Sequence, residues 1–274
     1  SEELCLRSGK AFSVKPGSLP GSIPMIPELL TESRMRSFAA DDPHTPWRIP
    51  AGLSREEIEP VWIDLARTNV LYLSGREQGG RHNWVTCAVH ELERYFAGQY
   101  RIYVADGYSR RLRWLKGRPG IEEYTTDPDR AVKMLLSIAS QLSIRHQEIC
   151  HREEAEDPWP LLLFLLDSPD TLERFGTDPK ALETWKELTG RYKRLQVCVM
   201  ILCVENEPIS FNAPEPLRRL RDQGVCLFFD TLKNCRLFEM PYSRAGQKPE
   251  DFQPGDAWLL QNSERIRIRT PLAE

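Results

Sequence analysis

Three unbroken apolar runs constrain the fold of this chain more than any other feature of its sequence. They span Leu161–Leu166, Val197–Val204 and Val225–Phe229, and the segments between them are long enough to hold helices. A strand that is apolar at every position is buried on both faces, as happens when helices cover both sides of a parallel sheet. The runs therefore predict an α/β domain with a mostly parallel central sheet flanked by helices.

Weaker patterns on either side add further strands and helices. Val61–Leu65, Val70–Leu73 and Arg101–Ala105 are short predicted strands. Apolar residues between Val85 and Phe96 recur with the helical period. Asp127-Pro128 is typical of a helix start, because Asp is a good N-cap and Pro is tolerated at the first helical position.

The end of the chain has a different pattern. Arginine and isoleucine alternate over Arg265–Arg269, which is the period-two pattern of a half-exposed strand. Ala257–Leu260 is expected to pair with this strand across the turn at Gln261–Glu264. The sequence therefore predicts a C-terminal β-hairpin.

Residues 1–50 are rich in proline and glycine, and we predict a connector that wraps the following domain. Proline at this density disfavours regular helix or sheet, although one helix fits within Pro27–Phe38. Residues 51–274 are then the folded module.

Composition narrows the class of protein. A net charge of −3 over 274 residues lacks the basic excess of a nucleic-acid motor, so nucleic acid is not an expected partner. Seven cysteines without a C-x-x-C pair indicate reduced, buried thiols rather than a zinc site. No apolar stretch approaches the roughly 20 residues of a membrane span.

The loop after the second predicted strand carries the main functional signal. Gly75 and Gly80 fit the glycines of the P-loop pattern G-x-x-x-x-G-K-[ST], with Gly79 beside them. Arg81 occupies the lysine position and His82 the Ser/Thr position. The alternative interpretation is an ordinary glycine-rich turn between a strand and a helix.

The two departures weaken the chemistry that the pattern normally supports. Arg81 keeps the positive charge but is bulkier and planar, so it does not simply replace lysine. His82 lacks the hard hydroxyl oxygen that Mg²⁺ prefers. Glu77 adds a negative charge to a loop meant for phosphates. Backbone N–H groups at the helix N-terminus would still attract an anion.

A second element supports a P-loop ancestor. The apolar strand Leu161–Leu166 ends in Asp167, as in a Walker B segment, where the carboxylate would hold Mg²⁺ through water. Ser168 stands where an active ATPase has a second acid to polarise water. The alternative role for Asp167 is the N-cap of a helix. We therefore assign no catalytic residue and no metal ligand.

One basic run follows the third strand. It could contact phosphate, a neighbouring subunit or an acidic partner, and its alternative interpretation is a solvated loop. The run consists of Arg110, Arg111, Arg113, Lys116 and Arg118.

The order of these motifs is similar to that of a known family. The phrases that carry the likeness are Ile26-Pro27-Glu28, Ile49-Pro50-Ala51-Gly52-Leu53, Pro60-Val61-Trp62-Ile63-Asp64-Leu65, Arg101-Ile102-Tyr103-Val104-Ala105-Asp106, the strand ending in Asp167, and Pro254-Gly255-Asp256-Ala257-Trp258. In this order and spacing the chain resembles the FtsK/SpoIIIE-type ATPase modules of the type VII secretion coupling protein, EssC or EccC, and most of all the last module.

The resemblance implies a RecA-like P-loop NTPase fold with a degenerate nucleotide site. It implies a cytoplasmic module of a bacterial membrane protein that carries several ATPase modules in tandem and assembles as a hexamer. Expected partners are the neighbouring modules and secreted substrates of the WXG type. No cofactor is expected beyond weakly bound ATP and Mg. The alternative is a working ATPase with an atypical P-loop, a motor that translocates protein or DNA.

Overall fold

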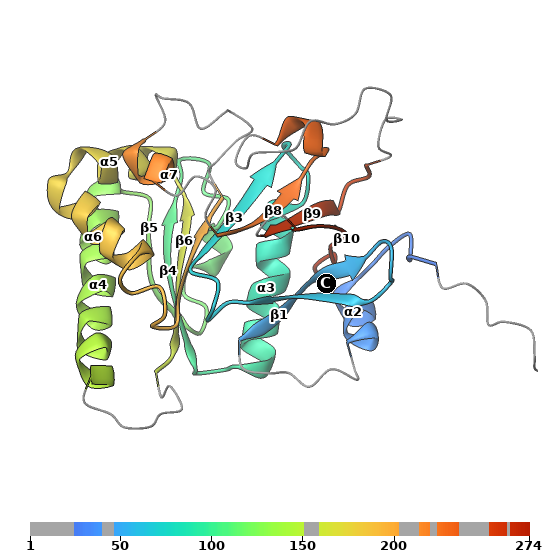
Figure 1. Ribbon diagram of the computed structural model, residues 1–274, viewed down its shortest axis with the longest axis horizontal. Helices are drawn as coiled ribbons and strands as arrows, with labels where there is room; N and C mark the ends of the chain where they lie inside the picture. The colour runs from blue at the N-terminus through green and yellow to red at the C-terminus, as the bar shows by residue number, and fades with distance from the viewer. Residues whose placement is uncertain are drawn as a thin grey trace, which may run out of the picture.

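A single mixed sheet of ten strands organises the computed structural model of the chain (Figure 1). The structure describes residues 25–39, 47–150, 159–202, 214–219, 224–235, 252–261 and 264–274. The strands follow the order β2-β1-β10-β9-β8-β3-β7-β6-β4-β5.

Six neighbouring strands form the parallel part of the sheet, as the apolar runs predicted. They are β8 (Val225–Phe229), β3 (Val70–Gly75), β7 (Val197–Ile201), β6 (Leu161–Asp167), β4 (Tyr100–Asp106) and β5 (Ile121–Thr125). Every residue of β3, β6, β7 and β8 is buried. Burial on both faces explains why these strands have no polar positions to alternate.

Four antiparallel strands extend the sheet. They are β9 (Asp256–Gln261), β10 (Glu264–Arg269), β1 (Arg48–Ser54) and β2 (Pro60–Asp64). β9 and β10 form the predicted hairpin, which joins β8 on one side and β1 on the other. The C-terminal segment therefore lies beside the start of the folded module.

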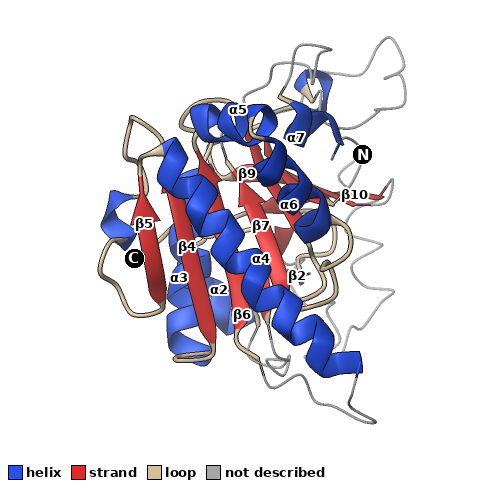
Figure 2. Cartoon of the chain, turned by 90° about the vertical axis from the view of Figure 1, so that its left-hand side faces the viewer, coloured by secondary structure: helices blue, strands red, loops and turns tan. Residues whose placement is uncertain are grey.

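Helices cover both faces of the parallel strands (Figure 2). One face carries α4 (Pro128–Cys150), α5 (Pro169–Thr177), α6 (Pro179–Thr189) and α7 (Glu215–Arg219), and the other carries α3 (Arg81–Tyr95) and α2 (Glu32–Phe38). Two hydrophobic cores result, one on each face of the sheet. Short 3₁₀ turns occur at Arg113–Leu115 and Leu232–Asn234.

β1 is the main difference from the sequence prediction. The boundary that we placed between residues 50 and 51 falls inside this strand, which includes Pro50. The register shifts between Pro50 and Gly52, so the proline sits beside a bulge, where strands tolerate it. Residues 1–24 and 40–46 lie outside the described residues, so the wrapping of the connector stays a prediction.

Other elements were missed or shortened. The strand β5 and the helices α5, α6 and α7 were not predicted from the sequence. The predicted strand Val197–Val204 ends at Ile201, and its last two residues lie outside the described part.

Two findings bear on the compositional arguments. Among the described residues, no helix is long and apolar enough to cross a membrane. Four cysteines of the described part are buried free thiols: Cys87, Cys198, Cys226 and Cys235.

Candidate functional site

The loop between β3 and α3 has three residues with positive φ values. Gly75 and Gly80 have φ values of +136° and +122°, and Gln78 has a φ of +56°. A Cβ on Gly75 would lie 2.7 Å from the Phe229 backbone, and one on Gly79 would lie 2.8 Å from the Phe229 carbonyl oxygen. Only glycine fits such close approaches, so Gly75 and Gly79 let the loop pack directly against the end of β8.

The helix α3 begins at the end of this loop, so the free backbone N–H groups of its first turn lie next to the loop. Gly80 is the N-cap and makes no side-chain capping bond, and no acidic residue lies in the first turn. Trp84 fixes the helix, because it is fully buried and its indole N–H donates to the Ala51 carbonyl oxygen at 3.1 Å. An uncapped N-terminus of a long helix is favourable for an anion.

Arg81, at the position of the P-loop lysine, is buried. Its exposed fraction is 5%, and its Nη1 has no hydrogen-bond partner in the described part of the chain. A buried, unsatisfied guanidinium nitrogen is costly. The sequence predicted a retained positive charge here, and the structure encloses that charge within the site.

His82 and Asp167, the two residues at the magnesium-binding positions, are bonded to each other. His82 Nε2 lies 2.7 Å from Asp167 Oδ2, and the side chains are 24% and 7% exposed. A carboxylate only accepts hydrogen bonds, so the imidazole N–H donates. An N–H group that points at the carboxylate cannot ligate a cation, and Mg²⁺ requires oxygen ligands in near-octahedral geometry.

The described residues contain no group of three or more His, Cys, Asp or Glu side chains that could hold a metal ion. Imidazole and a single carboxylate are a poor donor set for Mg²⁺. While the His82–Asp167 bond is formed, the imidazole nitrogen that faces Asp167 cannot ligate a cation and supplies no oxygen to Mg²⁺.

Ser168 serves the fold rather than water activation. It is the N-cap of α5, where its hydroxyl accepts hydrogen bonds from the Thr171 backbone N–H at 3.2 Å and from the Thr171 hydroxyl at 2.9 Å. The capping role that we considered for Asp167 thus belongs to the next residue.

Asp106, at the end of β4, was not predicted as a site residue. It lies in register with Asp167 on the neighbouring strand and is 1% exposed. Its carboxylate accepts from the backbone N–H groups of Gly107 and Leu112 and from the Tyr124 hydroxyl at 2.7 Å. Burial raises the pKa of Asp106, and these three donors act against that rise.

A sequence signal for Asp106 existed. Two predicted parallel strands each run into an aspartate, and the carboxyl ends of parallel strands meet at one edge of a sheet.

The closing hairpin holds a second buried carboxylate beside the loop. Asp256 is fully buried and pairs with Arg55, Arg267 and Arg269, the last at 2.9 Å. The backbone N–H of the preceding Gly255 donates to the Gly79 carbonyl oxygen at 3.4 Å. The alternating arginines of the predicted half-exposed strand thus include two that pair with Asp256.

No family model and no curated protein sequence matches the chain. Among solved structures, EssC ATPases 2 and 3 from Geobacillus thermodenitrificans are similar over the whole chain, with a TM-score of 0.73 and 22% identity.

Two further structures share the arrangement. EccC ATPases 2 and 3 from Thermomonospora curvata, in complex with a signal sequence peptide, match 94% of this chain and 46% of theirs, with a TM-score of 0.66 and 18% identity. The pCW3 conjugation coupling protein TcpA with ATPγS matches 90% of this chain and 70% of its own, with a TM-score of 0.59 and 13% identity.

The fold is that of the EssC and EccC ATPase modules. This chain spans 50% and 46% of the length of the EssC and EccC chains, each of which carries two such modules. Which EssC or EccC module it resembles most stays a prediction.

Proposed function

We propose that the chain is a degenerate ATPase module of a type VII secretion coupling protein. In this role it recognises exported proteins or regulates the neighbouring modules and does not hydrolyse ATP. The observation that carries the proposal is the 2.7 Å hydrogen bond between His82 and Asp167. It joins the two side chains that an active site of this kind would place on magnesium.

The energetic consequence is large. Phosphoryl transfer depends on positioned charges, and a single charged group can supply roughly 10³–10⁵ in rate. Each such loss raises the barrier by about 4–7 kcal/mol. Altered groups at Arg81, His82 and Ser168 therefore leave no useful turnover.

The remaining features of the proposal follow from similar proteins. An EccC structure contains a signal sequence peptide, and an EssC structure is described as the cytoplasmic domain of that protein. By likeness, we place this module in the cytoplasm as part of a membrane-anchored, hexameric protein. Its partners are then the neighbouring modules and WXG-type secreted substrates.

A second candidate is a working ATPase with an atypical P-loop. The observation in its favour is the loop geometry, in which an uncapped helix N-terminus lies beside the buried cation of Arg81. TcpA, which has a similar fold, was solved with ATPγS. In this case Arg81 would bind phosphate in place of lysine, with weak occupancy by ATP and Mg.

Calorimetric titration of the purified chain with Mg·ATP, together with a phosphate-release assay, separates the two. We expect affinity weaker than low micromolar and no phosphate release above buffer. Tight binding together with steady phosphate release would establish the second candidate instead.

The double variant Arg81→Lys/His82→Thr restores the P-loop pattern. We expect it to bind Mg·ATP about tenfold more tightly or better, because lysine reaches the phosphates and threonine supplies an oxygen to Mg²⁺. Arg76→Lys is the matched control, since Arg76 lies in the same loop at a variable position of the pattern and is exposed. Equal affinities for all three proteins would mean that the loop does not hold phosphate.

A further inference from the structure

A basic loop leaves the end of β4 beside the candidate site. We define it as residues 107–118. Tyr108 is fully exposed, with a relative exposure of 101%, although a tyrosine ring usually covers apolar surface. Arg110, Arg113 and Lys116 are also exposed.

The basic loop carries uncompensated positive charge. Arg118 makes a bidentate pair with Glu93 at 2.9 and 2.6 Å, and Arg111 approaches Glu77 at 3.4 Å. The side chains of Arg110, Arg113 and Lys116 form no ion pair with any residue that the structure describes. Three of the five cations predicted as one basic run are therefore available to a partner.

The first half of the basic loop is rigid. The Asp106 carboxylate accepts the backbone N–H groups of Gly107 and Leu112, which closes residues 107–112 into one turn. The Arg110 N–H donates to the Gly107 carbonyl oxygen at 3.0 Å, and Arg110 has a left-handed φ of +50°. Leu112 anchors the turn in the core. A strained backbone held by its surroundings is typical of functional loops.

Backbone rigidity matters for binding, because a turn that is already ordered loses little conformational entropy when a partner covers it. Tyr and Arg are also the residue types that dominate the binding energy of protein interfaces. An exposed tyrosine among unpaired cations on a fixed turn combines these properties.

We propose that the basic loop is a docking surface for an acidic segment of a partner protein, with Tyr108 packing against an apolar side chain of that segment. This inference rests on the proposed recognition role and names the chemistry of its partner. The carboxylates of the acidic segment would pair with the exposed cations Arg110, Arg113 and Lys116.

A protein segment fits this surface better than nucleic acid. Carboxylates lie beside two cations of the basic loop: Glu77 approaches Arg111, and Glu93 pairs with Arg118. A continuous phosphate backbone would pass these carboxylates, whereas a short acidic segment contacts only the cations. The net charge of −3 also opposes a polyanion at long range.

The docking surface is connected to the candidate site. A Cβ on Gly107 would lie 2.6 Å from the Asp167 carbonyl oxygen, so the start of the basic loop touches the residue that binds His82. Glu77, the partner of Arg111, belongs to the glycine loop itself.

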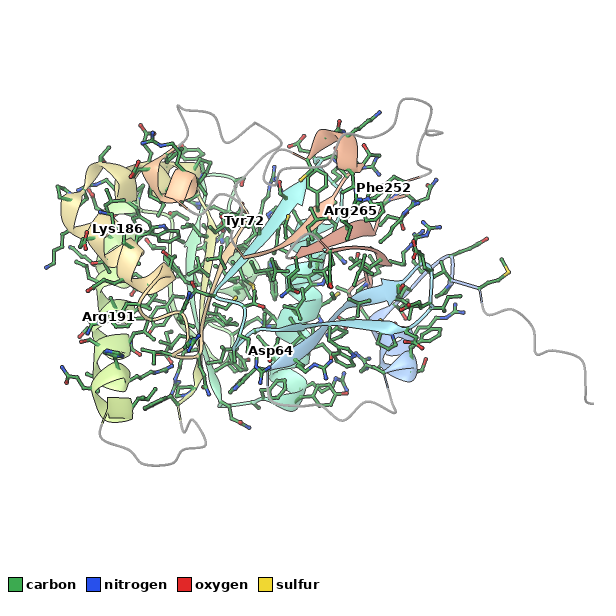
Figure 3. All side chains as sticks on the ribbon, viewed as in Figure 1. Asp64, Tyr72, Lys186, Arg191, Phe252 and Arg265 are labelled. Carbon is green, nitrogen blue, oxygen red and sulfur yellow. The ribbon has the colours of Figure 1, made fainter. Side chains whose placement is uncertain are left out.

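Fluorescence anisotropy with a labelled peptide of glutamate pairs separated by single leucines tests the proposal. The full chain is compared with Tyr108→Ala, Tyr108→Phe and Arg110→Glu/Arg113→Glu. The matched control is Lys193→Glu/Arg194→Glu, which changes the charge equally at exposed residues. These follow Arg191, which Figure 3 shows beside α4 and α6, on the other face of the sheet.

We expect Tyr108→Ala and Arg110→Glu/Arg113→Glu each to weaken peptide binding about tenfold or more, with Tyr108→Phe and the control near wild type. Equal losses in the control would overturn the proposal, because binding would then follow overall charge alone. A labelled single-stranded DNA that binds as tightly and needs the same side chains would also overturn it. Calorimetry with Mg·ATP tests the degenerate site separately, so failure here leaves that proposal standing.

Discussion

The pair formed by His82 and Asp167 gives the sharpest test of the structural reasoning. The Asp167 side chain is 7% exposed, and among the described residues its side-chain hydrogen-bond partner is the His82 imidazole, at 2.7 Å. His82→Ala would leave a buried carboxylate without this donor. Such a loss costs about 1–3 kcal/mol, and more when the group is charged. We therefore expect His82→Ala to lower the free energy of unfolding by about 2 kcal/mol.

A double-mutant cycle with His82→Ala and Asp167→Ala, measured by urea denaturation, isolates the pair. Residues in contact show coupling of about 0.5–3 kcal/mol, and we expect about 1–2 kcal/mol here. The control cycle uses Arg111 and Glu77, an exposed ion pair at 3.4 Å beside the same loop, whose side chains are 40% and 74% exposed. Solvent screens that pair, so its coupling should stay near zero and well below 1 kcal/mol.

Coupling between His82 and Asp167 no larger than that of the control would refute the argument. The two side chains would then not be joined in solution, and the position between them would be open to a cation. The assignment of a degenerate magnesium site would lose its main support.

Two further predictions test the surroundings of the site. Burial raises the folded pKa of Asp106 above its unfolded value of about 3.9, so its ionisation lowers stability as pH rises through that interval. The Tyr124 hydroxyl offsets part of this cost by donating to the ionised Asp106 carboxylate. Tyr124→Phe should therefore lower the free energy of unfolding by about 1–2 kcal/mol at neutral pH, and by less in acid, where Asp106 is protonated. Equal losses in urea titrations at the two pH values would contradict this. Gly75→Ala should cost about 3 kcal/mol or more in chemical denaturation, because the added Cβ meets the Phe229 backbone at a φ of +136°. Gly98→Ala is its control and should cost about 1 kcal/mol, since its φ of +78° is strained but nothing lies within 4 Å; equal costs would show that the glycine loop can relax.

Much of the fold could be predicted because its determinants are local. The buried strands appear as apolar runs, the glycine loop follows its strand directly, and the hairpin shows period-two alternation. β1 escaped prediction for an equally local reason. Pro50 and Gly52 are poor strand residues. The bulge between them accommodates Pro50, and the close approach of the Arg269 carbonyl oxygen leaves no room for a Cβ at Gly52.

The content of the candidate site was predictable only in part. The sequence identified Arg81, His82 and Asp167 as departures from, or remnants of, a nucleotide site. It did not show that His82 binds Asp167, 85 residues away. Asp106 and Asp256 lie in segments that carry the family resemblance, but their buried contacts beside the site were not predicted.

The sequence by itself determined the buried parallel strands from β3 to β8 other than β5, the closing hairpin, and where a glycine loop meets a helix, because periodicity and backbone freedom act over a few residues. Tertiary structure alone decided which side chains face one another across the sheet edge. Strand order brings β4 beside β6 and the C-terminal hairpin beside the glycine loop, and that order depends on how apolar surfaces from distant segments are buried together. The hydrogen bond between His82 and Asp167 is a product of this order.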